Sequence, residues 1–146
     1  MKTVKIMLVV LVIGMLGACT SKTSKPAPKV AADSSPIPAA RTVYFDFDKS
    51  EVKEEGRVVV DSHSGYLKGN RGAKVVLEGH CDERGSREYN VGLGERRSQA
   101  VRRLMLFQGV SDNQLETVSY GEERPAVVGH NEAAWSKNRR VEIVYK

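Results

Sequence analysis

The chain has 146 residues, enough for one domain and a leader, and its 40% hydrophobic and 28% charged residues are ordinary for a globular protein. Its 23 Lys and Arg outnumber its 18 Asp and Glu only slightly, and these charges are interspersed rather than gathered in blocks. Such weak, scattered basicity argues against a nucleic-acid-binding protein.

Residues 1–18 have the features of a secretory signal peptide. Lys2 and Lys5 precede an apolar run, Ile6 to Leu16, which is followed by small residues. A membrane-spanning helix needs about 20 apolar residues, so this run of 11 is too short to remain as an anchor. Removal of the segment leaves 21 basic against 18 acidic residues.

The end of this segment, Leu16-Gly17-Ala18-Cys19, resembles the lipobox of bacterial lipoproteins. The resemblance implies that Cys19 is the first mature residue and carries a diacylglyceryl group and an N-acyl chain, which together anchor a protein stably. Because Thr20 and not Asp follows, the resemblance to lipoprotein sorting in Gram-negative bacteria favours the outer membrane. The alternative is an ordinary signal peptide beside a chance cysteine.

The chain has one other cysteine, Cys81. If Cys19 is lipidated, Cys81 has no partner, and it is then either a small loop residue or a free thiol. A disulfide between the two cysteines is the rival interpretation.

Residues 19–40 are predicted to form the lipidated cysteine and a tether. Four of the five prolines lie in this segment among Ala, Ser, Thr and Lys, so it cannot bury enough apolar surface to order itself. Proline favours an extended form of ~3.1 Å per residue, which gives a reach on the order of 65 Å. We therefore expect a domain over residues 41–146, linked by this tether to an anchor.

The domain shows alternating strand and helix patterns. Val43, Phe45 and Phe47 alternate with polar residues, as in a half-buried strand, and Asp48 or Ser50 is available to cap the helix that follows. The later elements are helices over 49–68 and 88–108, the second ended by Gly109, strands over 74–79, 115–120 and 141–145, and a short helix near 133–137. This β-α-β-α-β-β order predicts an α/β (α+β) sandwich, with helices packed on one face of a small mixed sheet.

The second long helix carries an arginine on its apolar face. At the spacing of that face lie Leu93, Arg97, Ala100, Val101, Leu104 and Phe107. An arginine directed inward must find an anion, because burying an unpaired charge is costly. The alternative is an arginine at the edge of the face, with a packed stem and a solvated head.

A charged loop, residues 79–90, joins a predicted strand to that helix. Ligands in α/β folds tend to bind outside the C-terminal ends of strands, which is where Asp82 and Arg84 lie, and Asp48 follows the first strand in the same way. Asn90 lies two helical turns before the inward arginine, on the same face. The candidate pocket residues are therefore Asp48, Asp82, Arg84, Asn90, Leu93 and Arg97.

Carboxylates on one side of a pocket and a guanidinium on the other complement a zwitterion. An ammonium group would pair with Asp82, and a carboxylate could make a bidentate contact with Arg97. The alternative, in which Asp82 and Arg97 simply pair with each other, stays open on the residues alone.

Three long motifs carry a family resemblance: "VYFDFDKSEV", "EGHCDERGSREYNVGLGERRSQAV" and "SYGEERPAVVGHNEAAWSKNRR". Together with the lipobox they resemble the peptidoglycan-associated lipoproteins, a family with an OmpA C-terminal-like domain, over residues 41–146. In that family the domain binds peptidoglycan non-covalently through meso-diaminopimelate of the stem peptide, without a cofactor. The family's aspartate matches Asp82 and its arginine Arg97, whereas Cys81 departs from the usual alanine or threonine. The other matched positions are Asp48, Arg84, Asn90 and Leu93.

The resemblance also implies a place in the cell envelope. It indicates an outer-membrane lipoprotein on the periplasmic face that tethers the membrane to the cell wall as part of a Tol-Pal system, with a role in envelope integrity and cell division. The alternative is a domain that acts mainly as a protein-interaction module for TolB, a periplasmic partner of this family. The residues typical of such an interface are Tyr120, Arg124, Trp135, Arg139 and Arg140.

Catalysis and metal binding are disfavoured by the residues themselves. No nucleophile stands with a base, and a pocket of ion pairs can bind without chemistry. His80, Cys81 and Asp82 are consecutive and cannot easily close one tetrahedral metal shell. The sequence therefore predicts a binding protein and not an enzyme.

Overall fold

A computed structural model describes residues 36–146; the predicted signal peptide, Cys19 and the tether up to residue 35 lie outside the described residues. The elements run in the order β1 (Thr42–Tyr44), α1 (Glu54–Gly69), β2 (Val75–His80), α2 (Arg87–Phe107), a 3-10 turn (Asp112–Gln114), β3 (Leu115–Gly121), α3 (Glu132–Asn138) and β4 (Arg140–Tyr145). The predicted β-α-β-α-β-β order is confirmed, and α3 is the short helix expected before the last strand.

The four strands form one mixed sheet in the order β1-β4-β2-β3. β4 pairs antiparallel with both β1 and β2, whereas β2 and β3 are parallel. β1 and β2 are therefore not neighbours, but they run in the same direction on either side of β4. Their C-terminal ends lie at one edge of the sheet, and the loops that follow them leave from that edge.

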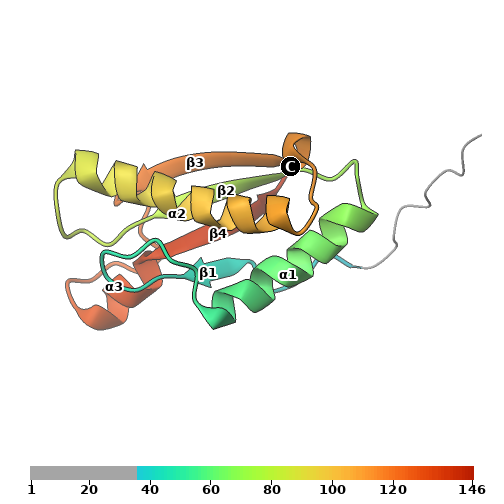
Figure 1. Cartoon of the computed structure of the whole chain (residues 1–146). Coiled ribbons are helices and arrows are strands. Elements are labelled where there is room, and N and C mark those ends of the chain that lie inside the picture. The colour runs from blue at the N-terminus through green and yellow to red at the C-terminus, as the bar shows by residue number, and fades with distance from the viewer. Residues whose placement is uncertain (1–35) are drawn as a thin grey trace, which may run out of the picture. The chain divides into compact units, whose positions relative to one another are not determined.

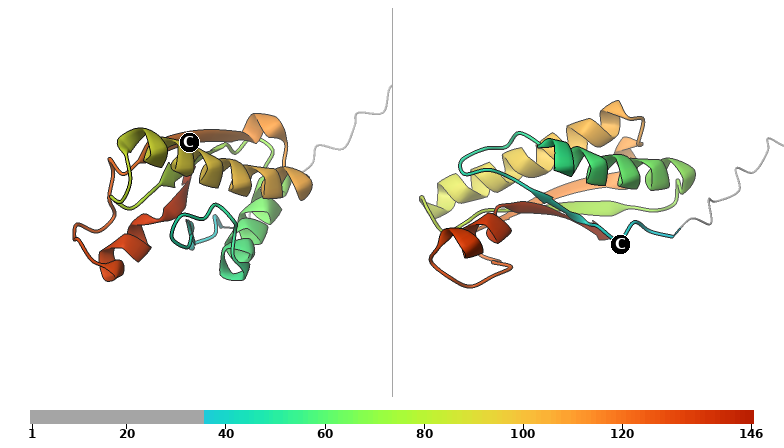
Figure 2. Two further views of the ribbon diagram at one scale, coloured as in Figure 1. Left: turned by 60° about the vertical axis from the view of Figure 1, so that its left-hand side comes forward. Right: turned by 90° about the horizontal axis from the view of Figure 1, so that it is seen from below.

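The two long helices cover one face of this sheet (Figure 1). α1 packs against β1, and α2 packs mainly against β2 and β3. α3 lies at the end of the sheet where β4 begins, away from the layer of the two long helices (Figure 2). The helix layer on one face of a mixed sheet is as predicted from the element order.

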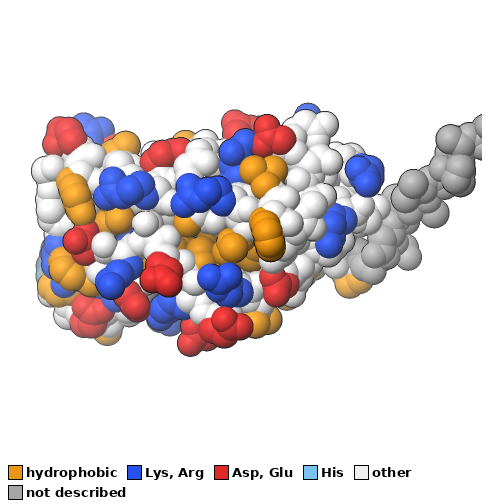
Figure 3. All heavy atoms as spheres, viewed as in Figure 1, with side chains coloured by type: hydrophobic (Ala, Val, Ile, Leu, Met, Phe, Trp, Pro, Cys, Tyr) orange, Lys and Arg blue, Asp and Glu red, His pale blue; other side chains and the backbone are white. Residues whose placement is uncertain are grey.

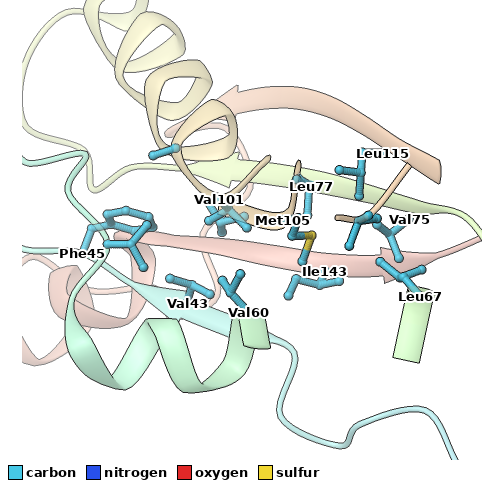
Figure 4. Close-up of a cluster of buried hydrophobic side chains, with 14 residues drawn as sticks. Val43, Phe45, Val60, Leu67, Val75, Leu77, Val101, Met105, Leu115 and Ile143 are labelled. Carbon is cyan, nitrogen blue, oxygen red and sulfur yellow. The ribbon is translucent and has the colours of Figure 1, made fainter. Parts of the chain in front are cut away.

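The hydrophobic core lies between the sheet and the two long helices (Figure 4). Each fully buried aliphatic side chain there contributes about 1.5–3 kcal/mol relative to exposure. All four strands and both long helices supply it, and its fully buried members include Val43, Val60, Leu67, Val75, Leu77, Val101, Met105, Val141 and Ile143. Residues 36–146 contain this one core, so the domain has what it needs to fold alone.

α2 begins and ends as its sequence indicates. The Ser86 hydroxyl caps the helix by accepting a hydrogen bond from Tyr89 N at 3.2 Å, and Gly109 follows it with a φ of 89°. The predicted apolar face is correct as far as Val101. Beyond it, Leu104 is partly buried against the core and Met105 is buried, whereas Phe107 is 91% exposed. Phe107 follows Met105 by two residues and therefore lies on the opposite side of the helix (α2 in Figure 1).

The segment between β1 and α1 differs from its prediction. The strand ends at Tyr44 and the helix begins only at Glu54, so neither Asp48 nor Ser50 is a helix cap. Asp48 has a φ of 57°, which is outside the helical region. The backbone here is held by Arg97 from α2, whose Nε donates to Lys49 O at 2.8 Å. A contact far away in the sequence therefore overrides the local helical pattern.

The face formed by α1 and α2 carries basic and acidic side chains in mixed positions (Figure 3), consistent with the interspersed charges of the sequence. Within residues 36–146, no helix is long and apolar enough to cross a membrane.

Candidate functional site

A pocket of about 200 Å³ opens where the loops after β1 and β2 meet the first half of α2. Its walls consist of Phe47, Asp48, Cys81, Asp82, Arg84, Gly85, Tyr89, Asn90, Leu93 and Arg97. All six residues that the sequence placed in a pocket therefore line one cavity. That they bind a ligand there stays a prediction.

Arg97 is fully buried and is hydrogen-bonded chiefly to backbone carbonyls. Besides its bond to Lys49 O, it donates from Nη1 to His80 O at 2.8 Å and from Nη2 to Asp46 O at 3.1 Å. A weaker contact of 3.4 Å joins Nη1 to Cys81 Sγ. Four of the five N–H groups of the guanidinium are thus used, and one Nη2 N–H remains for a ligand. Arg97 ties the loop after β1 to the end of β2.

The alternative in which Arg97 pairs with Asp82 is wrong, because the hydrogen bonds of the Asp82 side chain come from two other arginines. Oδ1 accepts from Arg84 N and Nε, both at 3.1 Å, and Oδ2 accepts from Arg84 Nη2 at 2.7 Å and Arg139 Nη1 at 3.3 Å. A carboxylate has about four acceptor positions, so this set occupies all of them. Burial raises the pKa of the Asp82 carboxyl, but the hydrogen bonds from both arginines outweigh it and the net pKa is lowered.

Arg84 is held by a carboxylate and by two aromatic rings. Its Nε and Nη2 form a bidentate pair with Asp82. Its Cζ lies 4.0 Å from the centroid of the Phe47 ring and 4.1 Å from that of the Trp135 ring. Within residues 36–146, the two N–H groups on Nη1 have no hydrogen-bond partner, so this edge can donate to an anion in the pocket.

Asp48 contributes the second carboxylate of the pocket. Its Oδ1 accepts a hydrogen bond from the Tyr89 hydroxyl across the pocket mouth, and this bond raises the pKa of Tyr89. Its other oxygen has no partner among the described residues. Asp48 also sits in the left-handed backbone region, which Asp tolerates better than most residues. Unpaired acceptor capacity in the pocket therefore lies on Asp48 rather than on Asp82.

The inner wall of the pocket is closed by buried groups. Asn90 is 1% exposed and donates from Nδ2 to Asp82 O at 3.2 Å and to Glu122. The Cys81 thiol donates to Asn90 O at 3.2 Å, and burial raises its pKa to about 11. Leu93 supplies the apolar contact. Cys81 is thus a small, protonated wall residue, and it is a free cysteine.

Close packing between α2 and the sheet explains one glycine of the helix. A Cβ on Gly94 would lie 2.3 Å from Ser119 Oγ, and a Cβ on Gly79 of β2 would lie 2.0 Å from Gly94 O. At Gly94 the helix backbone and the sheet therefore approach each other closely, and this contact fixes the height of Asn90 and Arg97 above the end of β2.

Several residues of the pocket wall were not expected from the sequence. Phe47 was expected to point inward from a strand, but the strand ends before it and the ring is 54% exposed at the pocket rim. Tyr89 and Gly85 also line the pocket. Gly85 has a φ of 106°, and its place in the charged loop was the one available signal.

The predicted partner surface divides into accessible and buried residues. Arg139 and Arg140 are 6% and 5% exposed. Arg139 is engaged by Asp82 and Glu132, and Arg140 Nε lies 2.6 Å from Glu142 Oε1. These two are therefore removed from the domain surface. Tyr120, Arg124 and Trp135 remain accessible, and their contact with a partner stays a prediction.

No group of three or more His, Cys, Asp or Glu side chains within residues 36–146 is arranged to hold a metal ion. The consecutive His80, Cys81 and Asp82 also differ in environment. Both His80 ring nitrogens are buried without a hydrogen bond, and burial lowers the pKa of His80 to about 4.

The profile of the OmpA family matches residues 44–139. The chain belongs to the OmpA family. Among its relatives in that family, the peptidoglycan-associated lipoprotein of Haemophilus influenzae is 44% identical over 151 residues, which cover 99% of each chain. That of Pseudomonas aeruginosa is 54% identical over 112 residues, which cover 77% of this chain and 66% of the relative. The family resemblance drawn from the sequence motifs is confirmed.

Solved structures of other proteins agree with this fold. The crystal structure of the peptidoglycan-associated lipoprotein from Burkholderia pseudomallei is 42% identical, has a TM-score of 0.74, and is matched over 80% of this chain and 99% of that chain. The C-terminal domain of Helicobacter pylori MotB has a TM-score of 0.68 at 19% identity, with 73% of this chain and 84% of that chain covered. The second likeness shows the fold alone.

Proposed function

We propose that this protein is an outer-membrane lipoprotein that binds peptidoglycan non-covalently and tethers the outer membrane to the cell wall. The observation that carries the proposal is one pocket with an open carboxylate, Asp48, beside the free N–H groups of Arg84 and Arg97. Membership of the OmpA family and full-length similarity to a peptidoglycan-associated lipoprotein support it. The pocket holds charges without a nucleophile and its base, so its role is binding and not catalysis.

The ligand is the free end of meso-diaminopimelate in the stem peptide. Its ammonium group lies toward Asp48, whose second oxygen can accept it, in the negative field of Asp82. Its carboxylate accepts from Nη1 of Arg84 and from the remaining N–H of Arg97. This pose refines the expectation that the ammonium binds Asp82 directly, because the acceptor positions of Asp82 are already occupied.

Stem peptides with lysine in place of diaminopimelate test this pose. They keep the terminal amine but lack the distal carboxylate, so they lose charge-assisted hydrogen bonds of about 1.5–3 kcal/mol. We expect lysine peptides to bind residues 36–146 roughly 10- to 100-fold more weakly than diaminopimelate peptides. Cosedimentation with purified sacculi and calorimetry with both peptides are the measurements. Equal affinity for the two peptides would rule out a carboxylate contact, and absence of sacculus binding would overturn the function.

Lipidation of Cys19 is the second part of the proposal, and it rests on the lipobox. We expect the mature protein to begin at a Cys19 that carries a diacylglyceryl group and an N-acyl chain, and to partition into detergent. Cys19→Ser should release the protein from the membrane or leave it unprocessed. Intact-mass analysis of the purified protein is the check, and an unmodified cysteine would contradict the anchor. Cys81→Ser is the matched control. It also removes a cysteine, but the Cys81 thiol is buried in the folded domain, so membrane attachment and processing should not change.

Binding of TolB within a Tol-Pal system is the second candidate function. It is favoured by the exposed loop between β3 and α3, whose backbone is hydrogen-bonded to a buried side chain. The buried Asn138 side chain accepts from Ala126 N at 2.8 Å and Val127 N at 3.0 Å, and donates to Val127 O at 2.8 Å. Val128 is 87% exposed on this loop, which also carries the accessible Arg124. Such a preorganised apolar projection suits a protein partner.

A further inference from the structure

Trp135 is the only tryptophan in the chain, and it does not line the pocket itself. It reaches the pocket through two consecutive residues of the loop after β2. Its Nε1 donates to Glu83 Oε1 at 2.9 Å, and its ring lies on the Arg84 guanidinium at 4.1 Å. Both contacts join α3 to a loop that is distant in sequence.

Two aromatic rings contact Arg84. The Cζ atom also lies 4.0 Å from the centroid of the Phe47 ring, and both distances are well inside the ~6 Å range of cation–π attraction. Asp82 occupies the edge formed by Nε and Nη2, and Glu132 Oε2 lies 3.7 Å from Nη2. Among the described residues, the N–H groups on Nη1 are therefore the ones left to meet a ligand.

The position of Trp135 is set by its own short helix. The Asn131 side chain caps α3 by accepting from Ala134 N at 3.1 Å, and Arg139 at the end of α3 is bound to Asp82 and Glu132. The ring therefore stands on an element that is fastened at both ends. Arg84 would otherwise be a long, flexible side chain with a large loss of rotamer entropy on binding.

We propose that Trp135 is a positioning residue of the peptidoglycan pocket, which holds the Arg84 guanidinium against Phe47 so that its Nη1 edge faces the ligand carboxylate. This inference rests on the proposed function. It assigns to α3 a part in wall binding, beside the contact with a partner that the sequence suggested for Trp135. Preorganisation of this kind raises affinity by removing an ordering cost that binding would otherwise incur.

Substitutions of Trp135 separate stacking from packing. Trp135→Leu keeps an apolar side chain without a ring, and we expect it to bind diaminopimelate peptides about 3- to 10-fold more weakly, in line with a cation–π contribution. Trp135→Phe restores a ring and should recover most of the affinity. Tyr120→Leu is the matched control, because it removes an aromatic contact of 3.7 Å with Arg124 outside the pocket. Calorimetry on residues 36–146 measures the peptide affinity of the wild-type domain and of these three variants.

The single tryptophan also gives a direct readout. Binding of a diaminopimelate peptide at the Nη1 edge should change the Trp135 emission of the wild-type domain, and Arg84→Met should abolish that change. A double-mutant cycle of Trp135→Leu with Arg84→Met should show that the two effects on affinity are not additive. If the domain binds sacculi but Trp135→Leu retains wild-type affinity, or if binding leaves the emission unchanged, the positioning role is overturned and the proposed function stands. If the wild-type domain fails to bind sacculi, both the positioning role of Trp135 and the proposed function are overturned.

Discussion

Arg97→Ala is expected to lower the free energy of unfolding by about 3–5 kcal/mol, because it leaves a cavity and removes the hydrogen bonds that one buried guanidinium donates to backbone carbonyls. The carbonyls of Asp46, Lys49 and His80 all receive hydrogen bonds from this one guanidinium. Their loss frees the loop after β1 from α2. Wall binding should therefore be lost even where the variant is still folded, because Asp48 and Phe47 are no longer held at the pocket.

Arg97→Lys should not restore the protein. One ammonium group cannot reach three carbonyls that a planar guanidinium reaches together. Arg103→Ala is the matched control, since Arg103 is exposed on the same helix and its loss should change stability by less than about 0.5 kcal/mol. Urea unfolding and sacculus cosedimentation measure the two effects. An Arg97→Ala domain with wild-type stability would show that the guanidinium does not hold the loop after β1 against α2 and the end of β2.

The long elements could be predicted from the sequence because their patterns are local. β2 and α2 each carry apolar residues at periodic positions, and α2 is bounded by a serine cap and a following glycine. The loop after β1 could not be predicted, although its local pattern favoured a helix from residue 49. Its conformation depends on Arg97, which a reading of neighbouring residues does not connect with it.

The members of the candidate site could be predicted, but not which of them pair with each other and which remain available to a ligand. Positions after strands and on one helix face are enough to collect Asp82, Arg84 and Arg97 into a pocket. Which of them retains a free donor or acceptor depends on the competing partners. Asp82 is saturated because Arg139, directly after α3, donates a hydrogen bond to it, and no local sequence pattern indicates that contact. For the same reason, the stack of Trp135 on Arg84 was not foreseen.

Asp82→Asn should be the most damaging substitution of nearly equal shape in the pocket. The carboxylate lies between two guanidinium groups, and Arg139 is 6% exposed. Removing one partner of a buried ion pair costs about 3–5 kcal/mol, since the remaining charge is left uncompensated. Arg84 also loses the contact that orients it. We therefore expect both lower stability and at least ~30-fold weaker binding to diaminopimelate peptides, which corresponds to about 2 kcal/mol.

The effect of pH on stability separates this role from simple packing. The pKa of Asp82 is lower in the folded chain than in the unfolded chain, so its contribution is present above the unfolded value of about 3.9 and disappears as pH falls through the folded value. Asp82→Asn should remove that part of the acid dependence. Asp112→Asn is the control, because the Asp112 side chain is 70% exposed and pairs with Arg102 at the surface, where an ion pair contributes about 0–1 kcal/mol. Thermal unfolding of both variants from neutral to acid pH is the measurement. If Asp82→Asn kept the wild-type stability and the wild-type dependence of stability on acid pH, the carboxylate would not be what holds Arg84 and Arg139 in place.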